Sequence, residues 1–275
     1  MTTRIISAAV ALVIAVVVLI LHNTFVLPLA VGALAAIAVF EMFRAMKLNE
    51  HKPQMYIAIG YTLLSCMSYI WLNHGVLVWL NNNLFFAALL ISMSILFLIE
   101  HESLKAVDFF SMLAIPYIIN FSFSTLLYMN SVKVGGMFMI IVTLCGSWLA
   151  DSGAYFAGTF FGKTPLCPKI SPKKTVEGVI GGVVTNGVLF LIIGLVYEYL
   201  LDGAPLHYVF MILSGMICAV IGLVGDLTAS VIKRQYGIKD YGNIMPGHGG
   251  VMDRFDSFMF VAPFMYFVFS QGWII

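Results

Sequence analysis

Long apolar segments follow one another along almost the whole chain, and short polar stretches separate them. The nine segments are residues 5–21, 25–43, 55–72, 84–99, 108–129, 136–161, 176–200, 207–232 and 255–272. An apolar stretch of about 20 residues is the length of one transmembrane helix. The pattern therefore predicts an all-α polytopic membrane protein with about nine transmembrane helices.

The composition agrees with this class. The chain is 61% hydrophobic and only 10% charged, whereas soluble domains carry about 25% charged residues. The net charge is +1, and no basic block interleaved with aromatic residues is present, so nucleic acid is not an expected partner. The first apolar run follows Arg4 as in a signal peptide, but no small-residue cleavage site follows it. We interpret it as the first span of a single integral-membrane domain, residues 1–275.

The distribution of Lys and Arg predicts the orientation. If the N-terminus lies in the cytoplasm, Lys133 is the only Lys or Arg in a loop on the outer side. The loops near 73–83 and 201–206 carry no Lys or Arg. Because cytoplasmic loops are enriched in these residues, we expect a cytoplasmic N-terminus and an outer C-terminus. Every candidate site residue then lies on the cytoplasmic side.

The two halves of the chain differ in their polar content. In residues 1–133 the acidic side chains, such as Glu41 and Glu100, stand near the ends of spans, where charged groups usually reach the membrane surface. We therefore expect these spans to be mainly structural. Residues 134–275 hold the candidate chemistry and are expected to form the catalytic spans and cytosolic loops.

The sixth segment places polar residues on one helical face. Ser147, Asp151 and Tyr155 follow each other at intervals of four. An Asp inside a span is a functional candidate, although Asp151 could instead cap a helix or pair within the bundle. Glycines in the same segment would allow close helix packing; they are Gly146, Gly153, Gly158 and Gly162.

A polar stretch then leads into the seventh segment. Ser171, Lys173 and Lys174 come just before its apolar residues, and Glu177 stands at its start. A loop that runs into a helix N-terminus offers free N–H groups to an anion, and two lysines add positive charge. Glu177 has a structural alternative, because an acid in the first turn can also cap the helix.

Charge is concentrated between Asp226 and Asp256. This stretch holds eight of the Asp, Glu, Lys and Arg residues, of which the chain has 13 acidic and 14 basic. Positions i, i+4, i+7 and i+8 lie on one helical face; they are Asp226, Ser230, Lys233 and Arg234. The turn from Pro246 to Gly250 cannot be a helix interior, and its glycines let the backbone approach a ligand closely.

The acidic residues of this stretch indicate a metal. Asp253 and Asp256 are three residues apart, so both carboxylates can face one point. Carboxylates beside a phosphate-binding loop imply a hard cation such as Mg²⁺. The alternative is a cytosolic loop that is charged only by the positive-inside rule. That rule explains the Lys and Arg residues but not three Asp residues, the glycines and His248.

The same stretch resembles the signature of the phosphatidate cytidylyltransferases, also called CDP-diacylglycerol synthases. The matching residues are Ser230, Lys233, Arg234, Lys239, Asp240, Gly242, Pro246 to Gly250, Asp253, Arg254 and Asp256. Met245 departs from the usual Leu, Ile or Phe. Asp151 to Tyr155 and Ser171 to Gly178 resemble further motifs of the family, so the likeness covers about the C-terminal half.

The resemblance implies that CTP and phosphatidic acid react to give CDP-diacylglycerol and pyrophosphate, in a bacterial cell membrane and with Mg²⁺ as the cofactor. It implies metal binding by Asp226, Asp253 and Asp256. It implies catalytic roles for Lys173, Lys174, Lys233, Arg234, Asp253 and Arg254. It implies substrate binding by Asp151, Tyr155, Ser171, Glu177, Lys239, Asp240, His248, Gly249 and Gly250. The sequence leaves the oligomeric state open, a homodimer included.

Two other function classes stay open at this point. A CDP-alcohol phosphotransferase would also act on lipid phosphates, but its Asp-Gly-x-x-Ala-Arg pattern is absent from the sequence. A secondary transporter of an anion would also place Asp and Lys within a bundle, yet transporters commonly show internal repeats, and none is visible here. A flux assay compared with a CTP-dependent product assay would separate the transporter from the enzyme.

Overall fold

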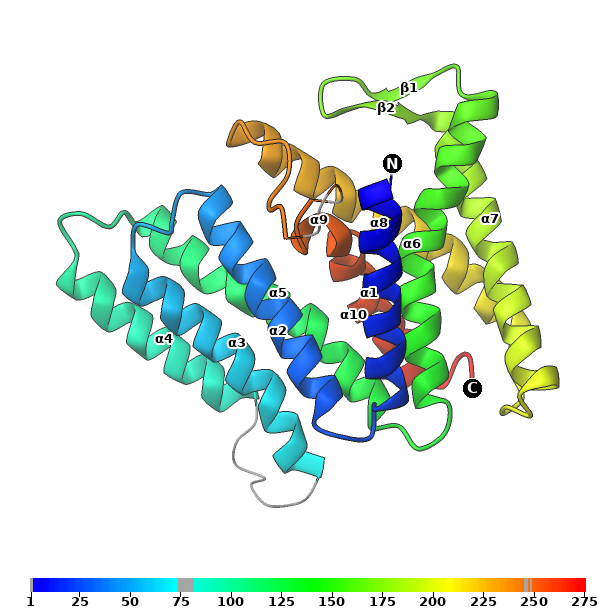
Figure 1. Cartoon of the computed structure of the whole chain (residues 1–275), viewed down its shortest axis with the longest axis horizontal. Helices are drawn as coiled ribbons and strands as arrows, with labels where there is room; N and C mark the ends of the chain where they lie inside the picture. The colour runs from blue at the N-terminus through cyan, green and yellow to red at the C-terminus, as the bar shows by residue number, and fades with distance from the viewer. Residues whose placement is uncertain (1, 74–81, 245–246, 248) are drawn as a thin grey trace. The chain divides into compact units, whose positions relative to one another are not determined.

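The computed structural model describes residues 2–73, 82–244, 247 and 249–275, and helices dominate them (Figure 1). Each of the nine apolar segments contains a helix, as predicted. The helices are α1 Thr2–Ile20, α2 Val26–Ala45, α3 Lys52–Asn73, α4 Asn82–Ile99, α5 Ala106–Asn130, α6 Gly136–Phe161, α7 Val176–Leu195, α8 Tyr208–Gln235, α9 Met252–Phe255 and α10 Phe258–Ser270.

Within the described residues, five stretches of helix are long and apolar enough to cross a membrane. They are α2, α5, α6, α7 together with the turn that follows it, and α8. Shorter apolar helices lie at Ile6–Ile20, Asn83–Ile99 and Phe258–Ser270. The chain is thus mostly helical and has the helices of a polytopic membrane protein.

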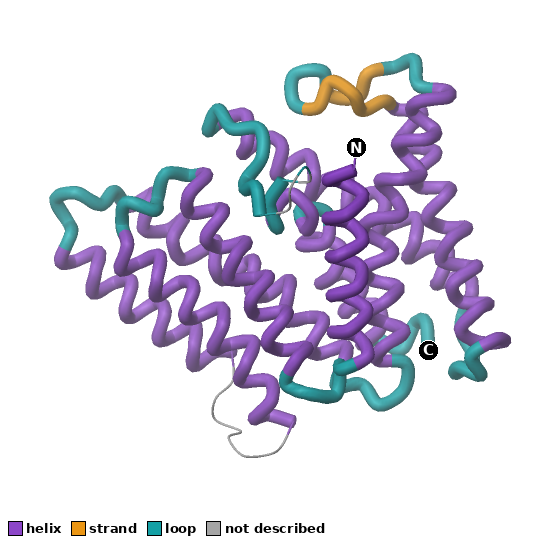
Figure 2. The backbone as a smooth tube through the Cα atoms, in the orientation of Figure 1, coloured by secondary structure: helices purple, strands orange, loops and turns teal. Residues whose placement is uncertain are grey.

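The all-α prediction is incomplete between α6 and α7. Between α6 and α7 the strands β1 (Pro165–Cys167) and β2 (Ser171–Thr175) pair in antiparallel fashion, where we expected a loop (Figure 2). At its other end α7 continues into a π-helical turn, η1 (Val196–Leu200). The strands are too short, and too rich in proline and lysine, to show the period of two that identifies a strand in sequence.

The helices and the connecting segments form two compact units. The first unit consists of Met1–Leu127 and Ile238–Arg254, and the second consists of Tyr128–Gly237 and Phe255–Ile275. The division falls inside the charged stretch that the sequence presents as continuous. Gly237, at the boundary, has a φ of +68°, a left-handed conformation that glycine adopts at little cost.

Polar and aromatic contacts tie the helices of the first unit together. The Asn120 amide on α5 donates to the Tyr61 hydroxyl at 3.3 Å and to the Ser65 hydroxyl at 3.0 Å, both on α3. Phe97 of α4 stacks on Phe109 of α5 with ring centroids 4.6 Å apart. A buried amide in an apolar bundle needs such partners, so these contacts fix α5 against α3 and α4.

Small residues bring α6 and α7 into close contact in the second unit (Figure 1). A Cβ atom on Gly153 would lie 2.7 Å from the Cβ of Thr185, and one on Gly182 would lie 2.9 Å from the Ala150 carbonyl oxygen. The buried Asn186 amide on α7 donates to Gly146 O at 3.3 Å and to Gly215 O at 2.7 Å. The predicted packing role of the α6 glycines is confirmed at Gly146 and Gly153, whose added Cβ atoms would collide with α7.

Candidate active site

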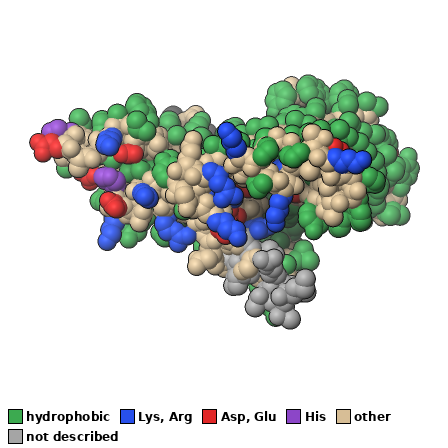
Figure 3. Space-filling model, turned by 90° about the horizontal axis from the view of Figure 1, so that it is seen from above, with side chains coloured by type: hydrophobic (Ala, Val, Ile, Leu, Met, Phe, Trp, Pro, Cys, Tyr) green, Lys and Arg blue, Asp and Glu red, His purple; other side chains and the backbone are tan. Residues whose placement is uncertain are grey.

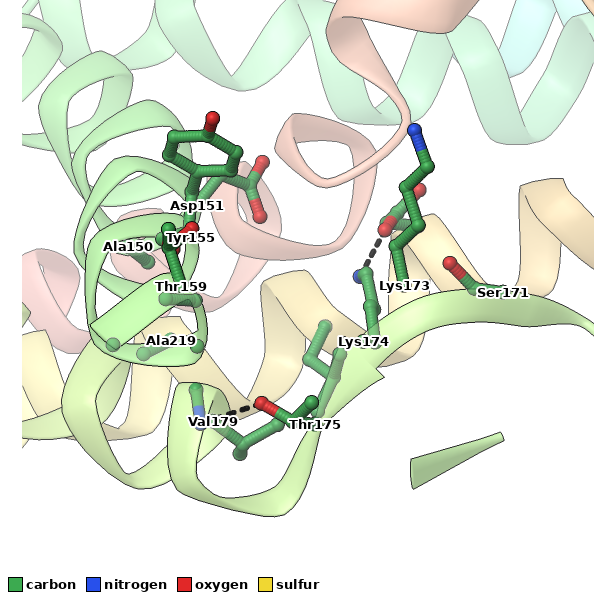
Figure 4. A pocket seen from close by; sticks show the side chains of 16 residues that line it. Ala150, Asp151, Tyr155, Thr159, Ser171, Lys173, Lys174, Thr175, Val179 and Ala219 are labelled. Carbon is green, nitrogen blue, oxygen red and sulfur yellow. Dashed lines mark hydrogen bonds and ion pairs between the residues drawn. The ribbon is translucent and has the colours of Figure 1, made fainter. Parts of the chain in front are cut away.

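A cavity of about 570 Å³ lies in the second unit, between α6, β2, α7 and α8 (Figure 4). This volume is within the range of small-molecule sites. Six of the residues that the sequence predicted as functional line it: Asp151, Tyr155, Ser171, Lys173, Lys174 and Asp226. They come from three different elements, α6, β2 and α8.

Local structure explains why these side chains meet. Asp151 and Tyr155 are one turn apart on α6 and both line the cavity, as their spacing of four predicts. β2 delivers Lys173 and Lys174 and ends at Thr175, the N-cap residue of α7. The Thr175 hydroxyl accepts a hydrogen bond from the Gly178 N–H at 3.1 Å. This cap fixes the angle at which the lysine-bearing strand enters the helix.

The two lysines have different surroundings. Lys174 forms an ion pair with Asp226 of α8, and each side chain is 23% exposed (Figure 4). Lys173 is more exposed, and Figure 4 shows its side chain reaching beyond the dashed line that marks this pair. The cavity therefore offers the cation of Lys173 to an anionic ligand, while the charge of Lys174 is balanced by Asp226.

Asp256, which precedes α10, belongs to the same electrostatic neighbourhood. It is 8% exposed, and its Oδ1 accepts a hydrogen bond from the Ser257 N–H at 2.7 Å. The Asp226 carboxylate is near enough to repel the Asp256 carboxylate. Asp151 also repels it, whereas Lys233 attracts it. Three carboxylates and one lysine of the second unit thus influence one another.

The carboxylates of the second unit are oxygen donors of the kind that the expected cation prefers. Among the residues that the structure describes, no three His, Cys, Asp or Glu side chains are arranged to hold a metal ion. Mg²⁺ is commonly held by only one or two carboxylates, and water and phosphate oxygens complete its coordination. Asp226 and Asp256 are hard oxygen donors that repel each other, so this pair fits such a cation.

Asp253, the third predicted metal ligand, is in the first unit and has a different environment there. Its Oδ2 accepts hydrogen bonds from the Tyr241 N–H at 2.8 Å and the Gly250 N–H at 3.0 Å. Gly249, beside it, has a φ of +85°. The Asp253 carboxylate therefore holds the backbone of Tyr241 and the backbone of Gly250 together.

The remaining predicted residues of the charged stretch lie near the surface. Lys233 is half-buried and Arg234 exposed in the last turn of α8, where cations are favoured by the helix dipole. Lys239, Asp240 and Arg254 are exposed residues of the first unit. His248, predicted to contact substrate, lies outside the described residues.

Glu177 fastens the hairpin to α7. Its carboxylate accepts hydrogen bonds from the Lys163 N–H at 3.0 Å, from the Thr164 N–H at 3.1 Å and from the Thr164 hydroxyl at 2.9 Å. It is absent from the cavity wall, so its predicted contact with substrate stays a prediction. The capping alternative takes a different form, because Thr175 is the N-cap and Gly178 occupies the N3 position.

Sequence reasoning missed one acidic residue of the first unit. Glu41 was interpreted as a charge at a span end, but it is 1% exposed on α2 and contacts the glycine-rich stretch. The available signal was its position inside an apolar segment, because ionisable groups in such segments are costly and usually have a role.

Comparisons with known proteins agree on one family. The model of the cytidylyltransferase family matches residues 2–271. The phosphatidate cytidylyltransferase of Haemophilus influenzae is 32% identical over 293 residues, which cover 97% of this chain and 98% of that protein. The Bacillus subtilis enzyme of the same name is 50% identical over 123 residues, 45% of this chain and 44% of that protein. The Aquifex aeolicus enzyme of that name is 42% identical over 147 residues, which cover 54% of this chain and 53% of that protein. The chain thus spans about half the length of the latter two relatives.

Proposed function

Because this chain belongs to the cytidylyltransferase family, we propose that it converts CTP and phosphatidic acid to CDP-diacylglycerol and pyrophosphate. The observation that carries the proposal is the cavity of the second unit. It gathers Lys173, Lys174, Asp151 and Asp226 from β2, α6 and α8. Two cations and two carboxylates in one cavity suit a polyphosphate that binds together with a divalent cation.

The proposed reaction needs positioning more than acid–base chemistry. A phosphate oxygen of phosphatidic acid attacks the α-phosphorus of CTP, and the bond from that phosphorus to the bridging oxygen of the β-phosphate breaks. Pyrophosphate takes the electron pair and leaves. The nucleophile is already an anion, so no strong general base is required. The protein contributes by holding two anions together and by balancing the charge that develops on the leaving group.

The surroundings of each residue support its proposed role. Lys173 binds a phosphate group of CTP, because it is the more exposed of the two cavity lysines. Asp226 and Asp256 would hold Mg²⁺, which when bound neutralises phosphate charge. Lys174 is paired with Asp226, so cation binding at Asp226 would release the ammonium group to a phosphate. Asp151 and Tyr155 shape the opposite wall.

We propose further that the chain crosses the cell membrane of a bacterium nine times and binds its nucleotide on the cytoplasmic side. The Lys and Arg asymmetry of the loops supports this orientation. Figure 3 shows Lys and Arg side chains at the surface of the protein. Nucleotides and phosphatidic acid head groups would both reach such a surface.

The experiment uses the purified full chain in lipid–detergent micelles with phosphatidic acid, Mg²⁺ and one of the four nucleoside triphosphates at a time. We expect pyrophosphate release with CTP and not with the other three nucleotides. Mass spectrometry should identify CDP-diacylglycerol in the lipid fraction. Pyrophosphate release without a cytidylylated lipid, or no release with any nucleotide, would contradict the proposal.

A further inference from the structure

Glu41 is the single carboxylate of the apolar helix α2, and it is buried. One of its carboxylate oxygens accepts a hydrogen bond from the Val251 N–H at 3.2 Å, and the other accepts one from the Met252 N–H at 2.8 Å. All three residues belong to the first unit. Burying a carboxylate is costly unless it is hydrogen-bonded. The two backbone groups therefore stabilise Glu41, and Glu41 in turn fixes the backbone beside Asp253.

Gly242 and Gly250 pack directly against the same carboxylate. A Cβ atom added to Gly242 or to Gly250 would collide with the Glu41 carboxylate oxygens. Both glycines are buried. Neither has a positive φ, so the reason for glycine here is close approach and not an unusual backbone conformation. The side chain of α2 and the two glycines fit one another.

Arg44 makes a second contact one turn further along α2. Its Nη2 donates to the Tyr241 carbonyl oxygen at 2.8 Å. The N–H of Tyr241 donates to Asp253, so the two contacts of α2 are linked through that carboxylate. Glu41 therefore holds the two residues that precede Asp253 in the chain, and Arg44 holds Tyr241, which is hydrogen-bonded to Asp253.

We propose that Glu41, assisted by Arg44, is a positioning residue for turnover. By fixing Val251 and Met252 it positions Asp253, for which the family resemblance implies a catalytic role, and the glycines next to it. The expected effect of Glu41 on turnover rests on the proposed function, but its hydrogen bonds to Val251 and Met252 do not. The Val251 and Met252 N–H groups are occupied by Glu41, so they are not the donors that bind phosphate.

The kinetic test compares Glu41→Gln with the wild type. Glutamine has the same size, but its NH₂ group would face one of the two backbone N–H groups. We expect kcat per folded molecule to fall by about 10- to 100-fold, the usual effect of losing a group that orients a site residue. KM for CTP should stay close to the wild-type value, because Glu41 does not line the CTP cavity. The control is Glu50→Gln, an exposed carboxylate beyond the end of α2, which should leave kcat and KM unchanged.

A second readout does not depend on activity. Hydrogen exchange of the peptide that contains Val251 and Met252 should become faster in Glu41→Gln and stay unchanged in Glu50→Gln. Wild-type exchange together with wild-type kcat in Glu41→Gln would overturn the inference. So would a loss of activity explained entirely by a smaller folded fraction. If the wild type forms no CDP-diacylglycerol, the proposed function fails, and exchange still decides whether Glu41 holds the stretch.

Arg44→Gln keeps the inference testable if Glu41→Gln does not accumulate. Arg44 is exposed, so its replacement should leave the packing of α2 intact. We expect a severalfold lower kcat and faster exchange in the peptide that contains Tyr241. Unchanged kcat and unchanged exchange in this variant would refute the positioning role of Arg44.

Discussion

At the scale of single residues, Lys173 and Lys174 are sequence neighbours with different electrostatic partners. Lys174 is paired with Asp226 across the cavity, whereas Lys173 is the more exposed of the two. The sequence predicted the same role, phosphate binding, for both lysines. Their spacing could not reveal that one of them pairs with Asp226 on α8. Helical spacing did predict correctly that Asp151 and Tyr155 share a face. The approach of Asp256 to Asp226 depends on tertiary packing and could not be read from spacing.

We expect Lys173→Ala to raise KM for CTP by about tenfold, the order of one charge-assisted hydrogen bond. Folding should be unaffected, because the side chain is exposed. Lys174→Ala should also lower stability, since it leaves the carboxylate of Asp226 without this cation. Lys169→Ala is the matched control, an exposed lysine of the same hairpin region that does not line the cavity. Steady-state kinetics and thermal unfolding would measure both effects, and identical CTP kinetics for all three variants would count against the proposed phosphate site.

The carboxylate pair predicts a metal dependence. Asp226→Asn and Asp256→Asn each keep the side-chain shape but remove a charge that would hold Mg²⁺. Turnover should fall by about 10²–10³, the loss seen for one preorganised electrostatic group. The Mg²⁺ concentration for half-maximal activity should rise, and added Mg²⁺ should restore only part of the rate. Product formation measured against Mg²⁺ concentration tests this. Wild-type turnover with an unchanged Mg²⁺ requirement would remove these residues from the metal site.

At the scale of secondary-structure elements, long apolar runs predicted every long helix, because burial in a bilayer demands continuous apolar length. The hairpin between α6 and α7 escaped prediction, since strands of three and five residues with prolines carry almost no periodic signal. The hairpin matters because it carries both cavity lysines. Its position depends on Glu177 and on the Thr175 cap, and therefore on how α7 packs against α6.

Glycine replacements test that packing. Gly153→Ala would place a Cβ atom 2.7 Å from Thr185. We expect it to push α6 from α7 at a cost of about 1–3 kcal/mol, as for other overpacked sites, and to lower activity at the cavity. Gly60→Ala on α3 is the control, because its added Cβ would meet nothing within 4 Å. That change should be neutral or stabilising by up to about 1 kcal/mol. Thermal unfolding of both variants gives the comparison, and equal stability would show that the α6–α7 contact tolerates a side chain.

At the scale of the whole molecule, one continuous signature is divided between two compact units. Ser230, Lys233 and Arg234 lie on α8 of the second unit, whereas residues 238–254 belong to the first. A sequence motif gives order along the chain but not membership of a folded unit, so this division was not predictable. Within the first unit, α2 contacts this part of the signature at Met252 and Tyr241.

The orientation in the membrane is the remaining whole-molecule prediction. Lys169, in the hairpin region, and Lys133, between α5 and α6, are both exposed, and the positive-inside rule places them on opposite sides. In a variant without the four native cysteines, Lys133→Cys should react with a membrane-impermeant thiol reagent in intact cells. Lys169→Cys should react only after the membrane is opened, and a reporter fused after Ile275 should lie outside. This pattern would place Lys173 and Lys174, which share the hairpin with position 169, on the side where CTP is present. Labelling of Lys169→Cys in intact cells, or a cytoplasmic reporter at the C-terminus, would contradict the nine-span topology and with it the cytoplasmic site.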